Sequence, residues 1–128
     1  MESVLIVAPH DYDAELRQRA SISWKLSDGP DRTWAIDDPQ GRIYVSRNEW
    51  ACDELEPERL AQIKAIIQNP IFYSMDFSDL NLSRRVLMTI ADDPNLLIDN
   101  DHGVLLSGSE FVRLLRSREN WDWRLDTP

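Results

Sequence analysis

Hydrophobic and polar residues alternate along the first half of the chain in a way that predicts strands. The apolar run at residues 4–8 predicts a first strand. The alternation at residues 21–26 predicts a half-buried strand, which turn-forming residues close at 27–31. Two further apolar runs, at 33–36 and 42–45, flank a segment with proline and glycine, which predicts a β-hairpin.

A change to helical spacing follows in the middle of the chain. The sequence around Pro57 is typical of a helix start, because proline fits the first helical position and acids lie near the positive end of the helix dipole. The apolar face of this helix is expected to carry Leu60, Ile63, Ile66 and Ile67. Residues 72–77 then predict an aromatic-rich strand, and residues 83–91 predict a short helix.

A second hairpin is predicted in the C-terminal third. Short apolar runs at 96–98 and 104–106 are separated by residues 99–103, whose Asn, Asp and Gly tolerate the positive φ that a tight turn needs. Ser107 and Glu110 have the spacing of a capping box, so a helix is expected to begin there.

These elements predict the fold class. Local hairpins mixed with helices favour an α+β fold, with a mostly antiparallel sheet built from hairpins and covered by about three helices. Trp121 and Trp123, beyond the last predicted helix, are expected to pin the C-terminus onto the body. We expect a single compact domain over residues 1–128.

The composition is that of an ordinary globular protein, with 42% hydrophobic and 29% charged residues. The single cysteine, Cys52, excludes an intramolecular disulfide and gives no sign of the disulfide-rich secreted class. The apolar run at residues 4–8 follows Glu2 rather than a basic segment and is too short for a signal sequence or a membrane span. A cytoplasmic protein that does not associate with membranes is therefore expected.

The net charge of −9 is unevenly distributed. The chain has 23 acidic and 14 basic residues, and the part up to Glu58 holds 13 of the acids but only 6 of the bases. Such a balance repels phosphate backbones, so direct nucleic-acid binding is not expected. An acidic surface can keep the protein in solution, or it can steer the protein toward a basic partner.

The polar residues of the predicted C-terminal turn are candidate metal ligands. A calcium loop that started at Asp99 would place Asp101 and Glu110 at the third and twelfth positions, as required. It would, however, place Val104 at the sixth position, where glycine is needed for the sharp turn. For zinc, the single histidine of the turn lacks the usual further nitrogen or sulfur ligands nearby, and His10 is the only other histidine.

Signatures of catalysis are also missing from the sequence. There is no G-x-S-x-G elbow, no Walker loop, no dinucleotide-binding glycine motif and no H-E-x-x-H. A nucleophilic Cys52 is disfavoured because two acidic neighbours oppose its thiolate. We therefore expect no catalytic residues, no metal and no cofactor, although a small metal-dependent hydrolase that uses Asp99, Asp101 and His102 stays as an alternative.

Three stretches of the C-terminal third form a pattern found in a known family. These are LIDNDHG at 97–103, SGSEFV at 107–112 and WDWR at 121–124, all within residues 71–124. They resemble a segment of small bacterial immunity proteins from polymorphic and contact-dependent toxin systems. The resemblance implies a cytoplasmic protein that binds a cognate toxin domain and blocks it without catalysis, but it assigns no toxin-binding residues.

An acidic chain without a catalytic signature fits a stoichiometric inhibitor, particularly of a basic enzyme such as a nuclease. The contact surface is predicted in the acidic N-terminal half, with carboxylates that steer the partner and Trp50 as the anchor. The predicted partner-binding residues are Asp28, Asp31, Asp37, Asp38, Glu49, Trp50, Asp53 and Glu54. A cytosolic adaptor or regulatory domain is the second alternative, and the sequence leaves self-association open.

Overall fold

The computed structural model describes residues 1–128 as a seven-stranded antiparallel sheet with five helices. The strands are β1 (Glu2–Ala8), β2 (Lys25–Asp28), β3 (Thr33–Asp38), β4 (Gly41–Arg47), β5 (Ile71–Phe77), β6 (Leu97–Asp99) and β7 (Leu105–Ser107). The helices are α1 (Asp13–Ser21), α2 (Ala51–Glu54), α3 (Pro57–Ile66), α4 (Leu80–Ile90) and α5 (Gly108–Ser117). The predicted α+β class and antiparallel sheet are confirmed in a single compact domain, with two more helices than expected.

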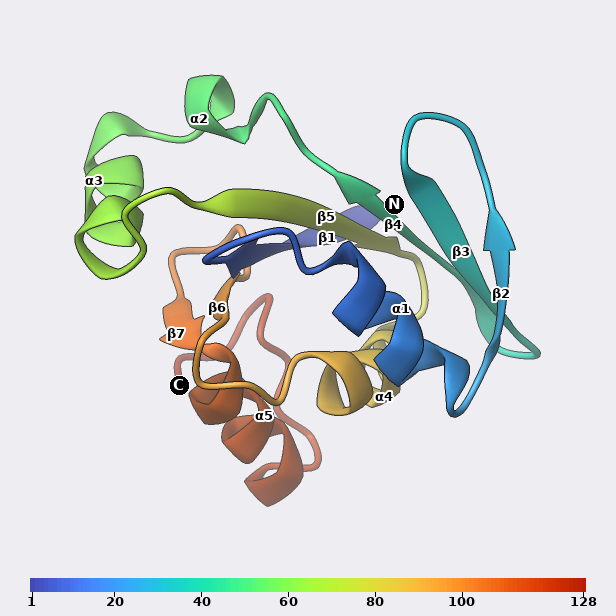
Figure 1. The fold of residues 1–128 in the computed structure, drawn as a ribbon. Helices are drawn as coiled ribbons and strands as arrows, with labels where there is room; N and C mark the ends of the chain where they lie inside the picture. Colours follow the sequence, from blue (N-terminus) through green and yellow to red (C-terminus); the bar gives the residue numbers. More distant parts are fainter.

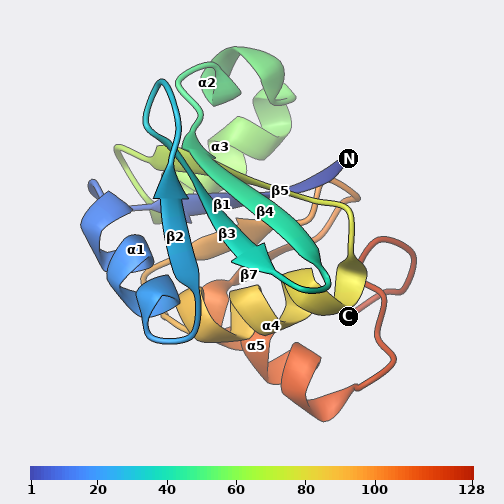
Figure 2. The same ribbon diagram turned by 90° about the vertical axis from the view of Figure 1, so that its right-hand side faces the viewer.

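The strand order in the sheet is β2-β3-β4-β5-β1-β6-β7. The N-terminal strand β1 lies inside the sheet, where Glu2 pairs with Phe77 of β5 and Val7 pairs with Leu97 of β6. The segment from β2 to β4 and the β6–β7 hairpin form the two outer parts of the sheet (Figures 1 and 2). Local hairpins are thus joined into one sheet by a strand that comes from the start of the chain.

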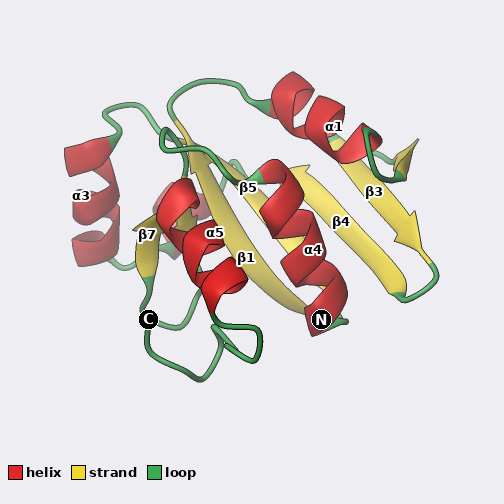
Figure 3. Cartoon of the chain, turned by 90° about the horizontal axis from the view of Figure 1, so that it is seen from below, coloured by secondary structure: helices red, strands yellow, loops and turns green.

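The main core lies on the face of the sheet that carries α1, α4 and α5, which we call the inner face (Figure 3). Alternate strand residues point into it, among them the fully buried Ile6, Ile36 and Met75. Helix α4 contributes Val86 and Ile90, which are four residues apart and therefore lie on the same side of the helix. Burial of these apolar side chains is the main source of stability for the fold.

The opposite, outer face carries only α2 and α3, which lie over one end of the sheet (Figure 1). A smaller apolar cluster forms there around Val7, Ile63 and Phe72. Alternation along the strands places polar residues such as Ser27 and Tyr44 on the rest of this face, and both side chains are half-buried. The outer face therefore combines a small covered region with a polar region that no helix covers.

A buried arginine holds the C-terminal tail against the helices of the inner face. Arg84 of α4 is 8% exposed. Its guanidinium donates hydrogen bonds to three carbonyl oxygens, those of Trp121 at 2.6 Å, Leu115 at 2.8 Å and Arg118 at 3.1 Å. Trp121 and Trp123 are both buried, so the prediction that they pin the C-terminus is confirmed.

Side chains cap the two longest inner-face helices. Asp79 precedes α4 and accepts a hydrogen bond from the N–H of Leu82 at 2.8 Å. Ser107 precedes α5 and accepts one from the N–H of Glu110 at 3.2 Å, as the capping box predicts. The reciprocal half of the box is absent, because the carboxylate of Glu110 binds Arg113 at 2.9 Å instead.

Helix α5 begins where the backbone passes very close to the end of α4. The N–H of Gly108 donates to the carbonyl oxygen of Leu96 at 2.8 Å. A side-chain Cβ at position 108 would collide with the carbonyl oxygen of Ala91 and would lie 2.7 Å from that of Asp93. This close approach of two backbone segments therefore requires a glycine.

The predicted strand at residues 21–26 is wrong over its first part. Helix α1 extends into this segment, and β2 begins only at Lys25. The N–H groups of Ser23 and Trp24 both donate to the carbonyl oxygen of Ala20, so the backbone closes the helix here instead of extending. Ile22, expected to point inward, is 82% exposed.

The other predicted strands and helices are confirmed, with shifts of a few residues at their ends. The buried apolar face of α3 is narrower than expected, because Ile63 is buried whereas Ile66 is 64% exposed. None of the five helices has both the length and the apolar character needed to cross a membrane.

Candidate functional site

Acidic side chains without a counter-charge gather on one side of the molecule. Eleven of the 23 acidic residues form ion pairs with arginines, and twelve do not. Eight of those twelve lie on or beside the outer face, around α2 and the start of α3. They are Asp31, Glu49, Asp53, Glu54, Glu56, Glu58, Asp76 and Asp101. We call these eight residues the acidic surface.

Trp50 stands within the acidic surface, next to a hollow. Trp50 precedes α2 and is 68% exposed. Its backbone N–H donates to the side-chain oxygen of Asn48 at 3.0 Å, which fixes the turn that leads into the helix. The adjacent hollow has a volume of about 380 Å³ and is lined by Asp31, Arg32, Arg47, Glu49 and Trp50. An exposed tryptophan beside arginines and carboxylates has the composition of an interface hot spot.

The turn between β2 and β3 brings Asp31 and Arg32 to this hollow. The N–H of Thr33 donates to the carbonyl oxygen of Pro30 at 3.0 Å. The two central residues, Asp31 and Arg32, have φ values of 53° and 59°, as in a type I′ turn. Neither is a glycine, so this backbone is strained by roughly 1 kcal/mol or more at each position.

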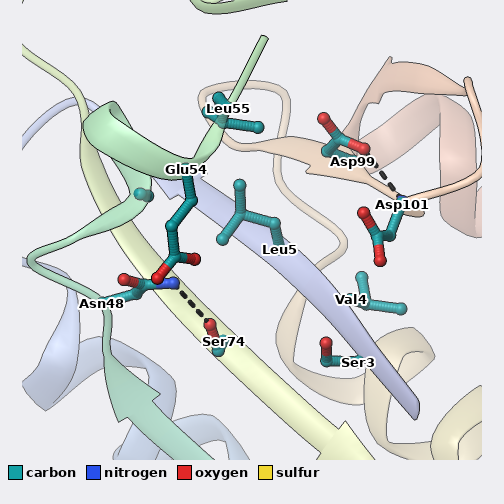
Figure 4. Close-up of a pocket in the computed structure, with 10 residues that line it drawn as sticks. Ser3, Val4, Leu5, Asn48, Glu54, Leu55, Ser74, Asp99 and Asp101 are labelled. Atoms are coloured by element: carbon teal, nitrogen blue, oxygen red, sulfur yellow. Dashed lines mark hydrogen bonds between the residues drawn. The ribbon is translucent and has the colours of Figure 1, made fainter.

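A second hollow, of about 280 Å³, lies between α2 and the outer face (Figure 4). Leu5 of β1 rises from its floor, with Glu54 of α2 on one side and Asp101 on the other. Leu55 and Asp99 line the end where the β6–β7 hairpin approaches α2. We call this hollow the α2 cavity. Its lining combines apolar side chains with three carboxylates.

Asp76 is a further acid beside the α2 cavity. It lies on the outer face of β5, where it pairs with Ser3 of β1 and Tyr44 of β4, and Ser3 lines the cavity. The side chain is half-buried and makes neither a hydrogen bond nor an ion pair. Burial raises the pKa of Asp76, because a charged carboxylate loses part of its hydration there. The N-terminal ammonium lies near enough to oppose this rise, but it forms no ion pair with Asp76.

Five of the predicted partner-binding residues lie near one another. Asp31, Glu49 and Trp50 line the same hollow, and Asp53 and Glu54 follow in α2. Figure 1 shows α2 and the β2–β3 turn at the same end of the molecule. The structure therefore assembles the part of the predicted surface that surrounds Trp50.

The other three predicted residues have partners within the chain. Asp28 and Asp37 each bind an arginine, at 2.5 Å and 2.6 Å. Asp38, at the far end of the β3–β4 hairpin, accepts hydrogen bonds from the indole of Trp24 at 3.1 Å and from Arg85 at 3.0 Å. The side chain of Asp38 is only 11% exposed. These three acids are thus compensated locally. Asp37 and Asp38 also lie at the end of β3 away from the β2–β3 turn, whereas Asp28 lies next to that turn.

The predicted hairpin turn at residues 99–103 is confirmed, and its polar side chains shape the backbone. Asp99 accepts a hydrogen bond from the N–H of Asp101 at 2.9 Å. Asn100 is buried and accepts bonds from two backbone N–H groups of the turn, both at 2.9 Å, while its amide donates to the carbonyl oxygen of Trp123. Asp101 has a φ of 63°, and His102 is exposed. No three His, Cys, Asp or Glu side chains come together as a metal site.

A buried polar network joins the β1–α1 connection to β5. The hydroxyl of Tyr73 donates to Asp11 at 2.9 Å and accepts from the N–H of Tyr12 at 2.8 Å. The hydroxyl of Tyr12 donates to Asp93 at 3.3 Å, and Arg19 also binds Asp93, at 2.9 Å. Burial opposes ionisation of Asp93, but the hydrogen bond from the backbone N–H of Asn95, together with Arg19 and Tyr12, outweighs it and lowers the pKa of the carboxyl. The network therefore links α1 and the segment before it to β5 and to the segment after α4.

This network predicts a loss of stability at alkaline pH. Burial raises the pKa of Tyr73 to about 12, whereas an unfolded chain ionises tyrosine near pH ~10. The folded state therefore binds the phenol proton more tightly, so this stabilisation is complete below pH ~10 and is lost as pH rises toward 12. We expect the free energy of unfolding from urea titrations to fall over this range, and Tyr73→Phe to flatten the fall. Equal slopes in the two proteins would contradict this assignment.

Comparisons with family models, with curated proteins and with solved structures find no match to this chain.

Proposed function

We propose that this chain is an immunity protein that binds and neutralises a cognate bacterial toxin domain. The contact is made by the acidic surface, with Trp50 as its anchor. The partner is a protein with a basic surface, such as a nuclease whose cationic substrate groove is occupied by carboxylates. In this mechanism the chain acts as a stoichiometric inhibitor and performs no reaction.

One observation carries this proposal, namely the segregation of uncompensated acids around an exposed tryptophan. Eight acids that lack an ion pair lie on the side of the sheet that also exposes Trp50. Carboxylates at the rim raise the rate of association with a basic protein, whereas a large aromatic side chain contributes most when the complex buries it. The resemblance of the C-terminal third to immunity proteins supports toxin neutralisation as the function, but it assigns none of the contact residues.

Co-expression with the product of the gene directly upstream tests the proposal, because an immunity protein is expected to be encoded next to its toxin. We expect this chain to restore growth to cells that produce the toxin, and to co-purify with it as a stable complex of equal stoichiometry. Because steering is electrostatic, the association rate should fall as salt rises. A chain that neither restores growth nor co-purifies with the toxin would refute the proposal. Binding to a housekeeping protein instead would identify an adaptor.

Replacing Trp50 by alanine is expected to weaken the complex about thirtyfold, which corresponds to about 2 kcal/mol for a hot-spot tryptophan. Because Trp50 is 68% exposed, the fold itself should keep its stability. Titration calorimetry of the complex measures the first effect, and urea unfolding measures the second. Ile22→Ala is the matched control, because Ile22 is 82% exposed but lies at the end of α1. Equal affinities of the two variants would exclude Trp50 as the anchor.

A further inference from the structure

We infer that the α2 cavity receives an arginine or lysine side chain of the protein partner. The cation would lie between the carboxylates of Glu54 and Asp101, and the aliphatic stem would lie against Leu5 and Leu55. The inference rests on the proposed function in taking the partner to be a basic protein, and it adds a specific contact that the proposed function does not require.

The size of the cavity favours a single long side chain. Its volume is about 280 Å³, slightly below the range of roughly 300 to 1,000 Å³ that is common for small-molecule sites. The cavity is also open to the surface and not enclosed. A side chain that projects from a docked protein surface can therefore enter it.

The walls of the cavity match the two parts of a basic side chain. Leu5 and Leu55, together with Ala51 at the first position of α2, give the cavity an apolar wall. The carboxylates of Glu54 and Asp101 lie on either side of Leu5 (Figure 4). Lysine and arginine bury their methylene stems against apolar surface while the charged group stays among polar atoms. The lining can therefore contact both the methylene stem and the charged group of such a side chain.

Two of the three carboxylates that line the cavity have no ion-pair partner within the chain. Of the three lining carboxylates, only Asp99 has an arginine near it, Arg59 at 3.5 Å. Glu54 and Asp101 are these two, and neither forms an ion pair. A hollow lined by charges of one sign and walled by apolar groups concentrates the field, so a cation is attracted there more strongly than to an open surface.

The arrangement of these carboxylates favours a side chain over a metal ion. Glu54 and Asp101 are on opposite sides of the Leu5 side chain (Figure 4), so they do not converge on one point. A metal ion needs several oxygen ligands at short distance around a single centre. A guanidinium group instead presents several donors in a fork that can bind separate acceptors, and an ammonium group on a flexible stem can approach either carboxylate.

The test is a titration of the isotope-labelled full chain with a hexa-arginine peptide, followed by nuclear magnetic resonance. We expect saturable shifts concentrated in the backbone amides of residues 3–5, 48–55 and 99–101. The double variant Glu54→Gln, Asp101→Asn should bind the peptide about tenfold more weakly, the change expected when interactions of partly exposed ion pairs are lost. The double variant Glu15→Gln, Glu119→Gln is the control, because it removes the same charge from two unpaired acids elsewhere.

Three results would overturn the inference. The first is a spread of peptide shifts over the regions of Glu15 and Glu119 comparable to that at the cavity. The second is equal weakening by the two double variants. The third is movement of the cavity amides by Mg²⁺ or Ca²⁺ alone to the same extent, which would indicate a metal site. Each leaves the proposed function intact if the unaltered chain still neutralises the toxin, whereas failure to bind any toxin refutes the function and leaves the peptide titration to decide the cavity.

Discussion

Replacing Gly108 by alanine is expected to lower the free energy of unfolding by about 3 kcal/mol, as for severe overpacking. The added Cβ would collide with the carbonyl oxygen of Ala91 and crowd that of Asp93. Both obstacles are backbone atoms, so neither can move aside as a flexible side chain would. Either α5 or the segment after α4 must shift, and the hydrogen bond from the N–H of Gly108 to Leu96 would weaken with it.

The sign of this effect separates packing from helix propensity. Gly108 is the first residue of α5, where alanine would by propensity alone be neutral or stabilising by up to about 1 kcal/mol. Ser109→Ala is the control at the next position, where the side chain makes no hydrogen bond and a change within about 0.5 kcal/mol is expected. Urea unfolding of both variants provides the measurement. A Gly108→Ala protein at least as stable as the unaltered chain would show that the close approach is not as described.

Replacing Arg84 by methionine is expected to cost about 3 kcal/mol of folding stability. Methionine retains most of the apolar stem, but it leaves three carbonyl oxygens without the donors that the guanidinium supplies. The carbonyl oxygen of Arg118 still accepts from the N–H of Trp121 at 3.0 Å, so two acceptors are left unsatisfied. An unsatisfied buried acceptor costs about 1–3 kcal/mol, and partial entry of water reduces the sum for the two. Arg84→Lys should recover only part of the loss, because an ammonium group cannot span three acceptors as a planar guanidinium does.

The neighbouring arginine supplies the control for this experiment. Arg85 binds Asp38 at 3.0 Å with its side chain 44% exposed, so Arg85→Met should cost less than about 1 kcal/mol. Tryptophan fluorescence adds a second readout, because release of the tail would expose Trp121 and Trp123, which are 4% and 1% exposed. A stable Arg84→Met protein with unchanged emission would show that the tail is held by its aromatic side chains alone.

Much of the fold follows from local sequence patterns, and what does not follow has identifiable causes. The β3–β4 and β6–β7 hairpins and the helices α3 and α4 are encoded by turn residues and hydrophobic spacing over short ranges. Helix α1 buries only Leu16 and Ala20, which gives too narrow an apolar stripe to distinguish it from a loop. The place of β1 in the sheet depends on pairing with distant strands, which local patterns do not specify.

The candidate site was predictable to a similar extent. An aromatic residue flanked by acids predicted Trp50 as the anchor. Which acids stay without a counter-charge is decided by ion pairs formed across the fold, and these cannot be predicted from local patterns. Asp38 is a clear case, since its partner Arg85 comes from α4. Asp76 was not predicted as a site residue, because the strand that contains it was predicted from its apolar residues alone. The alternation of Ser74 and Asp76 with buried neighbours was the signal that one face of this strand is polar.

The position of β1 inside the sheet affects the order in which strands can pair while the chain is being synthesised. Ala8 pairs with Ile71 and Glu2 with Phe77, so β1 cannot find its partner strand β5 until more than sixty further residues have been translated. Contacts so distant along the chain slow folding and leave an apolar segment transiently open to chaperones or to aggregation. A nascent chain that carries the whole segment around Trp50 but ends before β5 would therefore lack the strand that joins β4 to β1, and a truncation there should yield no folded product.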